Sequence, residues 1–223
     1  RLRPSHTDPA WNNRVRSRCS RSRLFHAGDS LVPCSGNPVS ALLPPGARCV
    51  FDAETVDAAV DRVAVEIALR LWDARPVVVC LMNGGLPFTA DLVRRFHFDL
   101  ELDYLHLSRY RHTTGGRLRF VRRLERSVEG RTVLLVDDVL DEGETLAAAQ
   151  REVMAKGCAE LLSAVLVRKD TQTATEVDYA ALEGPNEFLV GRGMDCDGAF
   201  RQLSGIYALP TGTLTVHWPG STP

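Results

Sequence analysis

The chain has 223 residues, of which 44% are hydrophobic and 25% charged, an ordinary composition for one medium-sized globular domain. The formal net charge is −1, so the molecule as a whole has no electrostatic attraction to nucleic acid or to an anionic membrane. No apolar run approaches the roughly 18 residues that a membrane-spanning helix needs.

The six cysteines do not have the spacing of a disulfide framework or of a metal site. They form no C-x-x-C pair, and none is placed with a histidine at the spacing of a zinc site. Cys80 lies in an apolar run and is predicted to be a buried thiol. The pattern therefore predicts a reduced protein of the cytoplasm.

Residues 1–48 differ in composition from the rest of the chain. Between Arg1 and Ser35 there are seven arginines, no lysine and two acids, with little periodicity. A transit peptide and a basic nucleic-acid-binding arm are the alternatives for such a segment, which lacks the apolar stretch of a secretory signal. We interpret residues 1–48 as a poorly ordered basic extension, residues 49–212 as the folded domain and residues 213–223 as a C-terminal tail.

Regular periodicity begins at Asp52. Residues 56–71 carry apolar side chains at helical spacing, with Asp52 as the N-cap. Residues 77–81 form a buried strand, and Pro87 opens a helix through about residue 96. Further strands are predicted at 100–107, 133–136, 161–167, 188–190 and 206–209, with a mobile loop or hairpin at 110–120. This alternation predicts an α/β fold in which a mostly parallel twisted sheet is flanked by helices.

The strand at 133–136 is followed by two adjacent carboxylates, Asp137 and Asp138, expected to be solvated beyond the strand end. A short loop then leads into a helix; it consists of Asp141, Glu142, Gly143, Glu144 and Thr145. Ligands of open α/β sheets bind outside the carboxyl ends of strands, and the N–H groups that begin a helix suit a phosphate. Paired carboxylates suit sugar hydroxyls or a divalent cation. Surface acids without a ligand are the alternative.

At residues 136–145 the pattern V-D-D-x-x-D-x-G-x-T resembles the phosphoribosyl-pyrophosphate (PRPP) motif of type I phosphoribosyltransferases, in the form of the hypoxanthine-guanine branch. The resemblance implies that family's fold, with a small hood for the base. It implies that Asp137 and Asp138 bind the ribose hydroxyls and that loop 141–145 binds the 5′-phosphate. It also implies that Asp141 takes the proton from N7 of a purine. A carboxylate that only favours the helix N-terminus is the alternative for Asp141.

The resemblance extends over about residues 50–210 and covers the loop after the first buried strand. Asn83 and Gly84 occupy the place of the pyrophosphate loop, where relatives commonly have a non-proline cis peptide. Many relatives have Lys or Arg where this chain has Asn83, so a charge-assisted contact is lost. Ser108, Arg109 and Tyr110 resemble the catalytic lid, which excludes water from the reacting centre. An ordinary glycine turn and an exposed hairpin are the respective alternatives.

The resemblance assigns the base to the end of the strand at 161–167 and to the segment at 188–190. Lys169 is implied to donate to the 6-oxo group of a purine, with Arg168 as the alternative register. Phe188 is implied to stack on the base, and the backbone of Leu189 to read its edge. The alternatives are a solvated lysine and a core phenylalanine.

The D-x-x-x-x-x-R spacing of Asp195 and Arg201 matches residues that the family places at the pyrophosphate. Arg201 is implied to bind the pyrophosphate itself, and Asp195 to lie beside a second magnesium ion. The resemblance thus implies Mg²⁺ as the cofactor, held by Asp137, Asp138 and Asp195. An exposed acid and an exposed arginine are the alternative.

The function implied by the resemblance is purine salvage: hypoxanthine or guanine plus PRPP gives IMP or GMP plus pyrophosphate. The implied partners are the two substrates and further copies of the chain, as a homodimer or homotetramer, with no membrane. A phosphoribosyltransferase for xanthine is one alternative; adenine is less favoured because it lacks a 6-oxo acceptor for Lys169. A PRPP-sensing nucleic-acid-binding regulator is the other, but it requires a basic face or an added helix-turn-helix.

Overall fold

The computed structural model describes residues 42–109 and 118–210. The helices are α2 (Ala53–Leu71), α3 (Leu86–Val93) and α4 (Glu144–Met154). The strands are β1 (Arg48–Phe51), β2 (Val77–Met82), β3 (Glu101–Arg109), β4 (Leu118–Arg122), β5 (Thr132–Leu140), β6 (Glu160–Lys169), β7 (Tyr179–Gly184), β8 (Phe188–Val190) and β9 (Ile206–Leu209).

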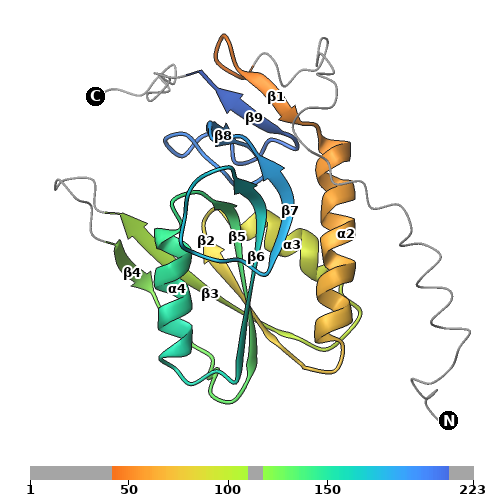
Figure 1. Ribbon diagram of the computed structural model, residues 1–223, viewed down its shortest axis with the longest axis vertical. Coiled ribbons are helices and arrows are strands. Elements are labelled where there is room, and N and C mark those ends of the chain that lie inside the picture. Colours follow the sequence, from red (N-terminus) through yellow and green to blue (C-terminus); the bar gives the residue numbers. More distant parts are fainter. Residues whose placement is uncertain (1–41, 110–117, 211–223) are drawn as a thin grey trace, which may run out of the picture.

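Nine strands form two sheets in the described part of the chain (Figure 1). The main sheet has the order β4-β3-β2-β5-β6-β7; β3, β2, β5, β6 and β7 run parallel, and β4 pairs antiparallel to β3. The smaller sheet, β1-β9-β8, is antiparallel and lies beyond one end of the main sheet. We call this smaller sheet the hood.

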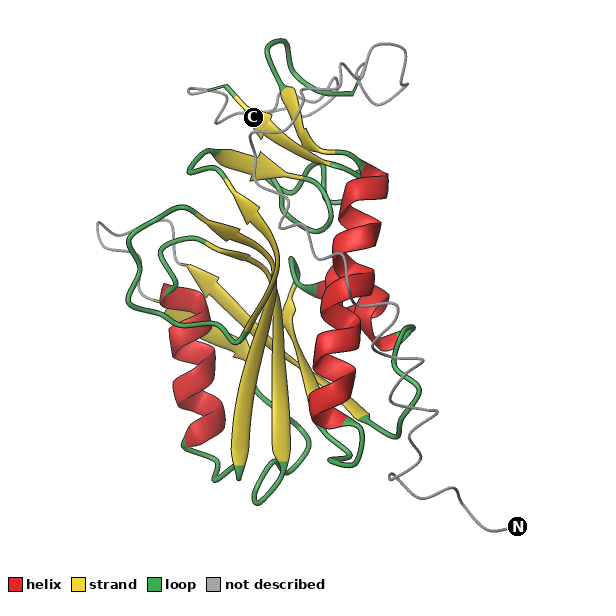
Figure 2. Ribbon diagram, turned by 45° about the vertical axis from the view of Figure 1, so that its right-hand side comes forward, coloured by secondary structure: helices red, strands yellow, loops and turns green. Residues whose placement is uncertain are grey.

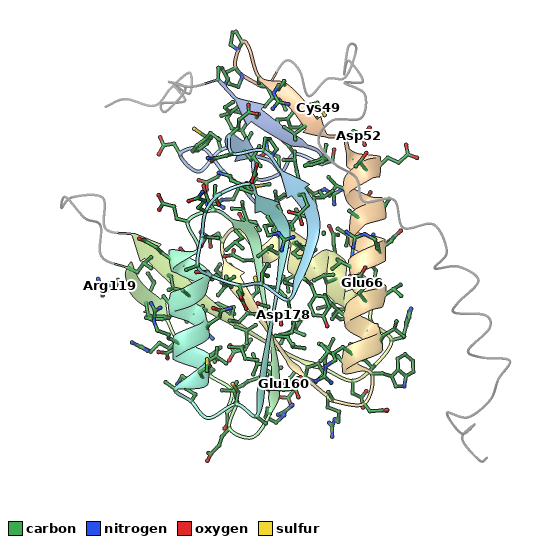
Figure 3. All side chains as sticks on the ribbon, in the orientation of Figure 1. Cys49, Asp52, Glu66, Arg119, Glu160 and Asp178 are labelled. Atoms are coloured by element: carbon green, nitrogen blue, oxygen red, sulfur yellow. The ribbon has the colours of Figure 1, made fainter. Side chains whose placement is uncertain are left out.

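The main sheet is covered on both faces, α2 and α3 lying on one side and α4 on the other (Figure 2). Its central strands therefore have apolar residues on both sides, as expected of a buried parallel sheet. Val77 and Val79 of β2 pack in the cluster under α4, while the intervening Val78 packs in the cluster under α2 and α3. Figure 3 shows the side chains that fill these two interfaces.

Helix α2 forms where the periodicity predicts it. Asp52 is its N-cap: the side-chain Oδ1 accepts the backbone N–H of Thr55 at 2.8 Å. The residues that α2 buries follow helical spacing; they are Val56, Ala59, Val60, Val63, Ala64, Ile67 and Leu71. The helix packs against β7 and α3, and so connects the hood end of the molecule to the base of the main sheet.

The predicted α/β class and mainly parallel sheet are confirmed. Three strands were not predicted: β1, which follows the proline-rich stretch before Asp52; β4, which overlaps the segment expected to be a mobile loop or hairpin; and β7, which lies in a region with weak alternation. The predicted helix at 87–96 is shorter, because α3 ends at Val93. The predicted strand at 133–136 is longer, because β5 continues through Asp137 and Asp138 to Leu140.

No helix within residues 42–109 and 118–210 is long and apolar enough to cross a membrane. Among the cysteines in those ranges, Cys80 and Cys158 are free thiols, and Cys49 and Cys196 are likewise not joined in disulfides. Cys80 is buried, as its place in an apolar run predicts, and burial raises the pKa of its thiol to about 11. A thiol with this pKa is protonated and unreactive at neutral pH.

Candidate active site

The topology creates a crevice at the carboxyl ends of β2 and β5. From β2 the chain crosses through α3 to β3 on one side, and from β5 it crosses through α4 to β6 on the other side. The two crossovers use opposite faces of the sheet, so the loops that follow β2 and β5 diverge. Ligands of open α/β sheets bind at such a switch point.

A cavity of about 650 Å³ occupies this crevice and gathers most of the predicted site residues. Those that line it are Asn83, Gly84, Ser108, Asp137, Asp138, Asp141, Glu142, Gly143, Glu144, Thr145, Asp195 and Arg201. They come from the ends of three strands and from the loop between β8 and β9. The fold therefore brings together residues that are as far as 118 positions apart, from Asn83 to Arg201.

The two adjacent acids lie inside β5, so the expectation that they are solvated beyond the strand is wrong. Asp137 is 8% exposed, and its Oδ1 accepts the N–H of Asp138 at 2.9 Å. Oδ1 of Asp138 likewise accepts the N–H of Val139 at 2.9 Å. Burial raises the pKa of Asp137 well above its usual range, and the neighbouring Asp138 charge adds to the shift. Burial also raises the pKa of Asp138, although its hydrogen bond with Asp137 and the charge of Arg201 oppose this.

Two desolvated carboxylates in sequence form a site suited to hydroxyl donors or to a cation. The described part of the chain has no group of three or more His, Cys, Asp or Glu side chains that could hold a metal ion without other ligands. Mg²⁺ is commonly held by one or two carboxylates together with phosphate oxygens of the substrate. Asp137, Asp138 and Asp195, all on the cavity wall, fit this mode of binding.

The loop at 141–145 is held by a row of three threonines that the sequence analysis missed. Gly143 has a φ of +78°, and a Cβ atom there would lie 2.5 Å from Oγ1 of Thr175, so the close approach requires glycine. The hydroxyls of Thr171, Thr173 and Thr175 donate, in that order, to the carbonyl oxygens of Asp141, Glu142 and Gly143 at 2.9, 3.0 and 3.2 Å. Because N–H and C=O of a trans peptide point in opposite directions, the loop N–H groups point away from the threonines. This orientation suits an anion bound before α4.

Lys169 and Arg168 point to different neighbours. The Nζ atom of Lys169 lies 2.5 Å from Oδ2 of Asp141, and the lysine side chain is 9% exposed. The guanidinium of Arg168 instead pairs with Glu183 on β7, with distances of 3.0 Å from Nε and 2.6 Å from Nη2. Of the two residues, Lys169 is therefore the one that faces the loop carrying Asp141.

Phe188 and Leu189 lie in the hood and do not line the cavity. Phe188 is 43% exposed, whereas Leu189 is 5% exposed and packs in the core under α2 and α3. An exposed aromatic ring above the carboxyl end of the sheet can stack on a planar ligand. Lys169 is also absent from the cavity lining and reaches it only through Asp141.

Asn83 and Gly84 meet the β8–β9 loop at the other end of the cavity. The Met82–Asn83 peptide bond is cis. A Cβ atom on Gly84 would lie 2.0 Å from Oδ2 of Asp138, so only glycine allows this approach. Arg201 binds Asp195 through Nη2 at 2.7 Å and donates from Nη1 to a backbone carbonyl at 2.6 Å. The arginine thus lines the same cavity as Asn83 and Gly84.

Two of the three predicted lid residues, Ser108 and Arg109, lie at the end of β3. Ser108 lines the cavity, and Arg109 is the last residue of the strand. Tyr110 and the rest of the predicted loop through residue 117 lie outside the described residues. The pairing of β3 with β4 shows that the segment is framed by a hairpin.

Comparison with known proteins identifies close sequence relatives. Residues 50–195 match the family described as the phosphoribosyl transferase domain. The hypoxanthine-guanine phosphoribosyltransferase of Bacillus subtilis is 27% identical over 166 residues, which cover 73% of this chain and 92% of the relative. The protein of the same name from Mycobacterium avium is 30% identical over 170 residues, covering 72% of this chain and 84% of the relative.

Solved structures of phosphoribosyltransferases have a similar fold. A hypoxanthine-guanine-xanthine phosphoribosyltransferase superposes with a TM-score of 0.67 at 27% identity, covering 73% of this chain and 96% of the other. The hypoxanthine phosphoribosyl transferase of Trypanosoma cruzi gives a TM-score of 0.67 at 28% identity, covering 73% and 91%. The family match spans well over half of the chain and includes the crevice between β2 and β5. The chain therefore belongs to the phosphoribosyltransferase family.

Proposed function

We propose that this phosphoribosyltransferase joins hypoxanthine or guanine to the phosphoribosyl group of PRPP, forming IMP or GMP and releasing pyrophosphate. The observation that carries the proposal is the single cavity that contains Asp137, Asp138, the loop at 141–145 and Arg201. The wall of this cavity therefore offers a chemically suitable group to each part of PRPP. Relatives named for these two bases align over most of their own length.

Different site residues are proposed to bind different parts of the two substrates. In the proposed assignment Asp137 and Asp138 bind the ribose hydroxyls, and loop 141–145 binds the 5′-phosphate. In the same assignment, pyrophosphate is bound by Asn83, Gly84 and Arg201, and the base is bound by Lys169, Phe188 and Leu189. Mg²⁺ is held by Asp137, Asp138 and Asp195. The lid comprises Ser108, Arg109 and Tyr110. Mg²⁺, when bound, supplies positive charge that stabilises the departing pyrophosphate.

Asp141 and Lys169 are proposed to act together at the base. Asp141 accepts the proton of N7 as N9 bonds to C1′ of the ribose, while Lys169 donates to the 6-oxo group. A lysine ammonium has three N–H donors, so Lys169 can bind the oxo group without releasing Asp141. Most of the rate enhancement then comes from holding two substrates in position in a site from which water is excluded.

A steady-state comparison of hypoxanthine, guanine, xanthine and adenine with PRPP and Mg²⁺ tests the proposal. The value of kcat/KM is expected to be highest for hypoxanthine and guanine and lowest for adenine, which cannot accept a hydrogen bond from Lys169. PRPP binding without turnover of any base would overturn the enzymatic assignment and favour the PRPP-sensing regulator.

Lys169→Ala is predicted to impair use of the base while keeping PRPP affinity. Loss of a hydrogen bond from a charged donor costs ~1.5–3 kcal/mol, or about 10- to 150-fold in kcat/KM for hypoxanthine and guanine. Arg168→Ala is the matched control, because Arg168 is paired with Glu183 on β7. If Arg168→Ala produced the loss and Lys169→Ala did not, the assignment of the base-reading side chain would be wrong.

Removal of residues 1–41 is predicted to leave the activity intact. Their sequence lacks apolar periodicity with which to bury a face against the domain, and β1 begins only at Arg48. A protein beginning at Leu42 is expected to stay soluble and to keep kcat within a few-fold of the full chain. Loss of solubility or activity would make the extension part of the domain or of an interface between copies.

We further propose that the protein works in the cytoplasm as a homodimer or homotetramer. Two of its cysteines, Cys80 and Cys158, are free thiols, which suit a reducing compartment. Light scattering of the full chain at several concentrations measures the number of copies in the assembly. A mass equal to one chain at every concentration would contradict the proposed assembly.

A further inference from the structure

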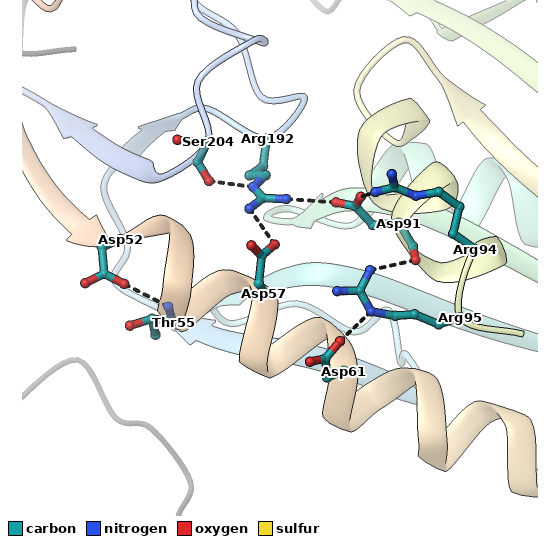
Figure 4. Close-up of polar contacts among 9 residues, drawn as sticks. All are labelled: Asp52, Thr55, Asp57, Asp61, Asp91, Arg94, Arg95, Arg192 and Ser204. Carbon is teal, nitrogen blue, oxygen red and sulfur yellow. Dashed lines mark hydrogen bonds and ion pairs between the residues drawn. The ribbon is translucent and has the colours of Figure 1, made fainter. Parts of the chain in front are cut away.

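The β8–β9 loop, residues 191–205, is tied to both helices on one face of the sheet by the guanidinium of Arg192 (Figure 4). Nη2 of Arg192 donates to Oδ1 of Asp57 on α2 at 2.6 Å, and Nη1 donates to Oδ2 of Asp91 on α3 at 2.8 Å. Nε donates to the carbonyl of Ser204 within the loop at 2.5 Å. The arginine side chain is 14% exposed and that of Asp91 is 13% exposed, so this pair is largely removed from solvent.

Arg192 and the next residue, Gly193, are hydrogen-bonded to the backbone of the segment at 201–203. The N–H of Arg192 donates to the carbonyl of Leu203 at 2.9 Å, and the N–H of the next residue, Gly193, donates to the carbonyl of Arg201 at 3.0 Å. Nη1 of Arg201 donates back to the carbonyl of Gly193 at 2.6 Å. Arg192 is therefore linked to Arg201 through its neighbour Gly193, which bonds to both the backbone and the guanidinium of Arg201.

The same short segment touches the loop proposed to bind pyrophosphate. Gly193 has a φ of +107°, and a Cβ atom there would lie 1.9 Å from the carbonyl oxygen of Gly84. Gly84 precedes Gly85, the N-cap of α3, and α3 is the helix that carries Asp91. The β8–β9 loop thus meets α3 and its leading loop at two points, through an ion pair at Asp91 and through backbone contact at Gly84.

Arg192 itself has a φ of +50°, a left-handed conformation that is uncommon for residues other than glycine. Such conformations persist where the surrounding contacts fix them, and they are concentrated at functional sites. Here three hydrogen bonds from one side chain fix it. A lysine could not reproduce them, because they diverge from one planar guanidinium.

We propose that Arg192 is a positioning residue for the pyrophosphate end of the site. Its ion pairs with Asp57 and Asp91 hold Gly193 against Gly84 and so set the distance between the pyrophosphate loop and Arg201. Arg192 does not line the cavity, so its effect passes through the loop. This inference rests on the proposed function: it makes Arg192 a residue on which the protein's affinity for pyrophosphate depends.

Arg192→Gln tests the inference by comparing two ligands that share the 5′-phosphate and ribose but differ in pyrophosphate. By calorimetry with Mg²⁺, the affinity for PRPP is expected to fall by about 10- to 100-fold, the scale of a misplacement of about 1 Å. The affinity for IMP, which has no pyrophosphate, is expected to stay at the wild-type value. In the reverse reaction KM for pyrophosphate should rise while KM for IMP does not, and Arg192→Lys should be intermediate.

Arg95→Gln is the matched control. Arg95 also bridges the two helices, donating to Asp61 of α2 at 2.6 Å and to the backbone carbonyl of Asp91 on α3 at 2.9 Å. These bonds leave the β8–β9 loop untouched, so this variant should bind PRPP and IMP in the wild-type ratio. If Arg192→Gln does not fold, Asp57→Asn replaces it: its carboxylate is 53% exposed, so the change is mild and should shift the ratio in the same direction.

The outcomes separate the inference from the function on which it rests. A selective loss of PRPP affinity in Arg192→Gln, absent from Arg95→Gln, supports the positioning role. Unchanged PRPP affinity, or equal losses for PRPP and IMP, overturns it. A wild-type protein that binds neither ligand overturns the proposed function instead.

Discussion

Replacement of both Asp137 and Asp138 by asparagine is expected to weaken PRPP binding by at least about 100-fold, because each hydrogen bond to a charged acceptor contributes ~1.5–3 kcal/mol. The two carboxylates are adjacent on the cavity wall and desolvated. Asparagine keeps the shape of each side chain but removes the negative charge that ribose hydroxyls and Mg²⁺ would meet. The loss should therefore appear in affinity, with the fold preserved.

The same double variant is expected to be as stable as the wild type or more stable. Burial raises the pKa of both carboxyls, so their charged forms are disfavoured in the folded protein relative to the unfolded chain. This destabilisation is absent below the ordinary carboxyl pKa of about 4, grows as the pH rises, and is complete above the raised folded pKa. Asparagine oxygens can still accept the N–H groups of Asp138 and Val139, now bound at 2.9 Å.

Urea unfolding of both proteins at about pH 4 and about pH 8, beside calorimetry with PRPP, measures the two effects together. We expect the stability difference in favour of the variant to widen at the higher pH while PRPP binding is lost. A folded variant with wild-type PRPP affinity would remove the pair from the ribose site. If the variant were less stable than the wild type at both pH values, the native carboxylates would make more favourable hydrogen bonds than their burial implies.

The stability expectation depends on a feature that the sequence alone misplaced. A continuous apolar run predicted the strand at 133–136, but the acids that follow were expected to lie outside it. Backbone pairing overrides the change in polarity, since Asp137 pairs with Val165 and Val139 with Val167 on β6. The change from apolar to acidic residues therefore does not mark the end of a strand when the strand continues into the site that binds a ligand.

The central sheet could be predicted because its strands are buried on both faces and read as continuous apolar runs. The strand β7 could not, because its burial depends on packing on α2 and on pairing with β6, neither of which its own pattern shows. Local pattern is a weak guide to such strands, since packing against neighbours decides them. The short β1 has only four residues and depends on its pairing with β9, which is distant in sequence.

The site was predictable where its residues follow one strand and unpredictable where the fold supports them from elsewhere. The motif at 136–145 singled out the two acids and the loop at 141–145 from sequence order alone, and all of them line the cavity. The alternate threonines at 171, 173 and 175 are visible in the sequence, yet only the structure shows that they bind three successive carbonyls of that loop. Arg192 gave no signal, because its partners Asp57 and Asp91 are 135 and 101 residues away.

Asp141→Asn is expected to lower kcat by about 10²- to 10⁴-fold, the range for loss of a general base. The substitution keeps the size of the side chain, and the backbone carbonyl of Asp141 keeps its hydrogen bond from Thr171 at 2.9 Å. The phosphate loop should therefore hold its shape, and both substrates should still bind. The acidic limb of the pH profile of kcat should disappear with the carboxylate.

Because Asp141 forms an ion pair with Lys169, the substitution must also be tested in a protein that lacks this lysine. Asp141→Asn leaves the ammonium of Lys169, which is 9% exposed, without its anionic partner, so a fall in kcat could arise from a misplaced lysine. The change is therefore also made in Lys169→Ala, and the two effects are compared in a double-mutant cycle. A general base should lower kcat by a similar factor in both backgrounds. If Asp141→Asn has no effect once Lys169 is alanine, Asp141 serves to position that lysine, and the proton of N7 must be accepted by another group.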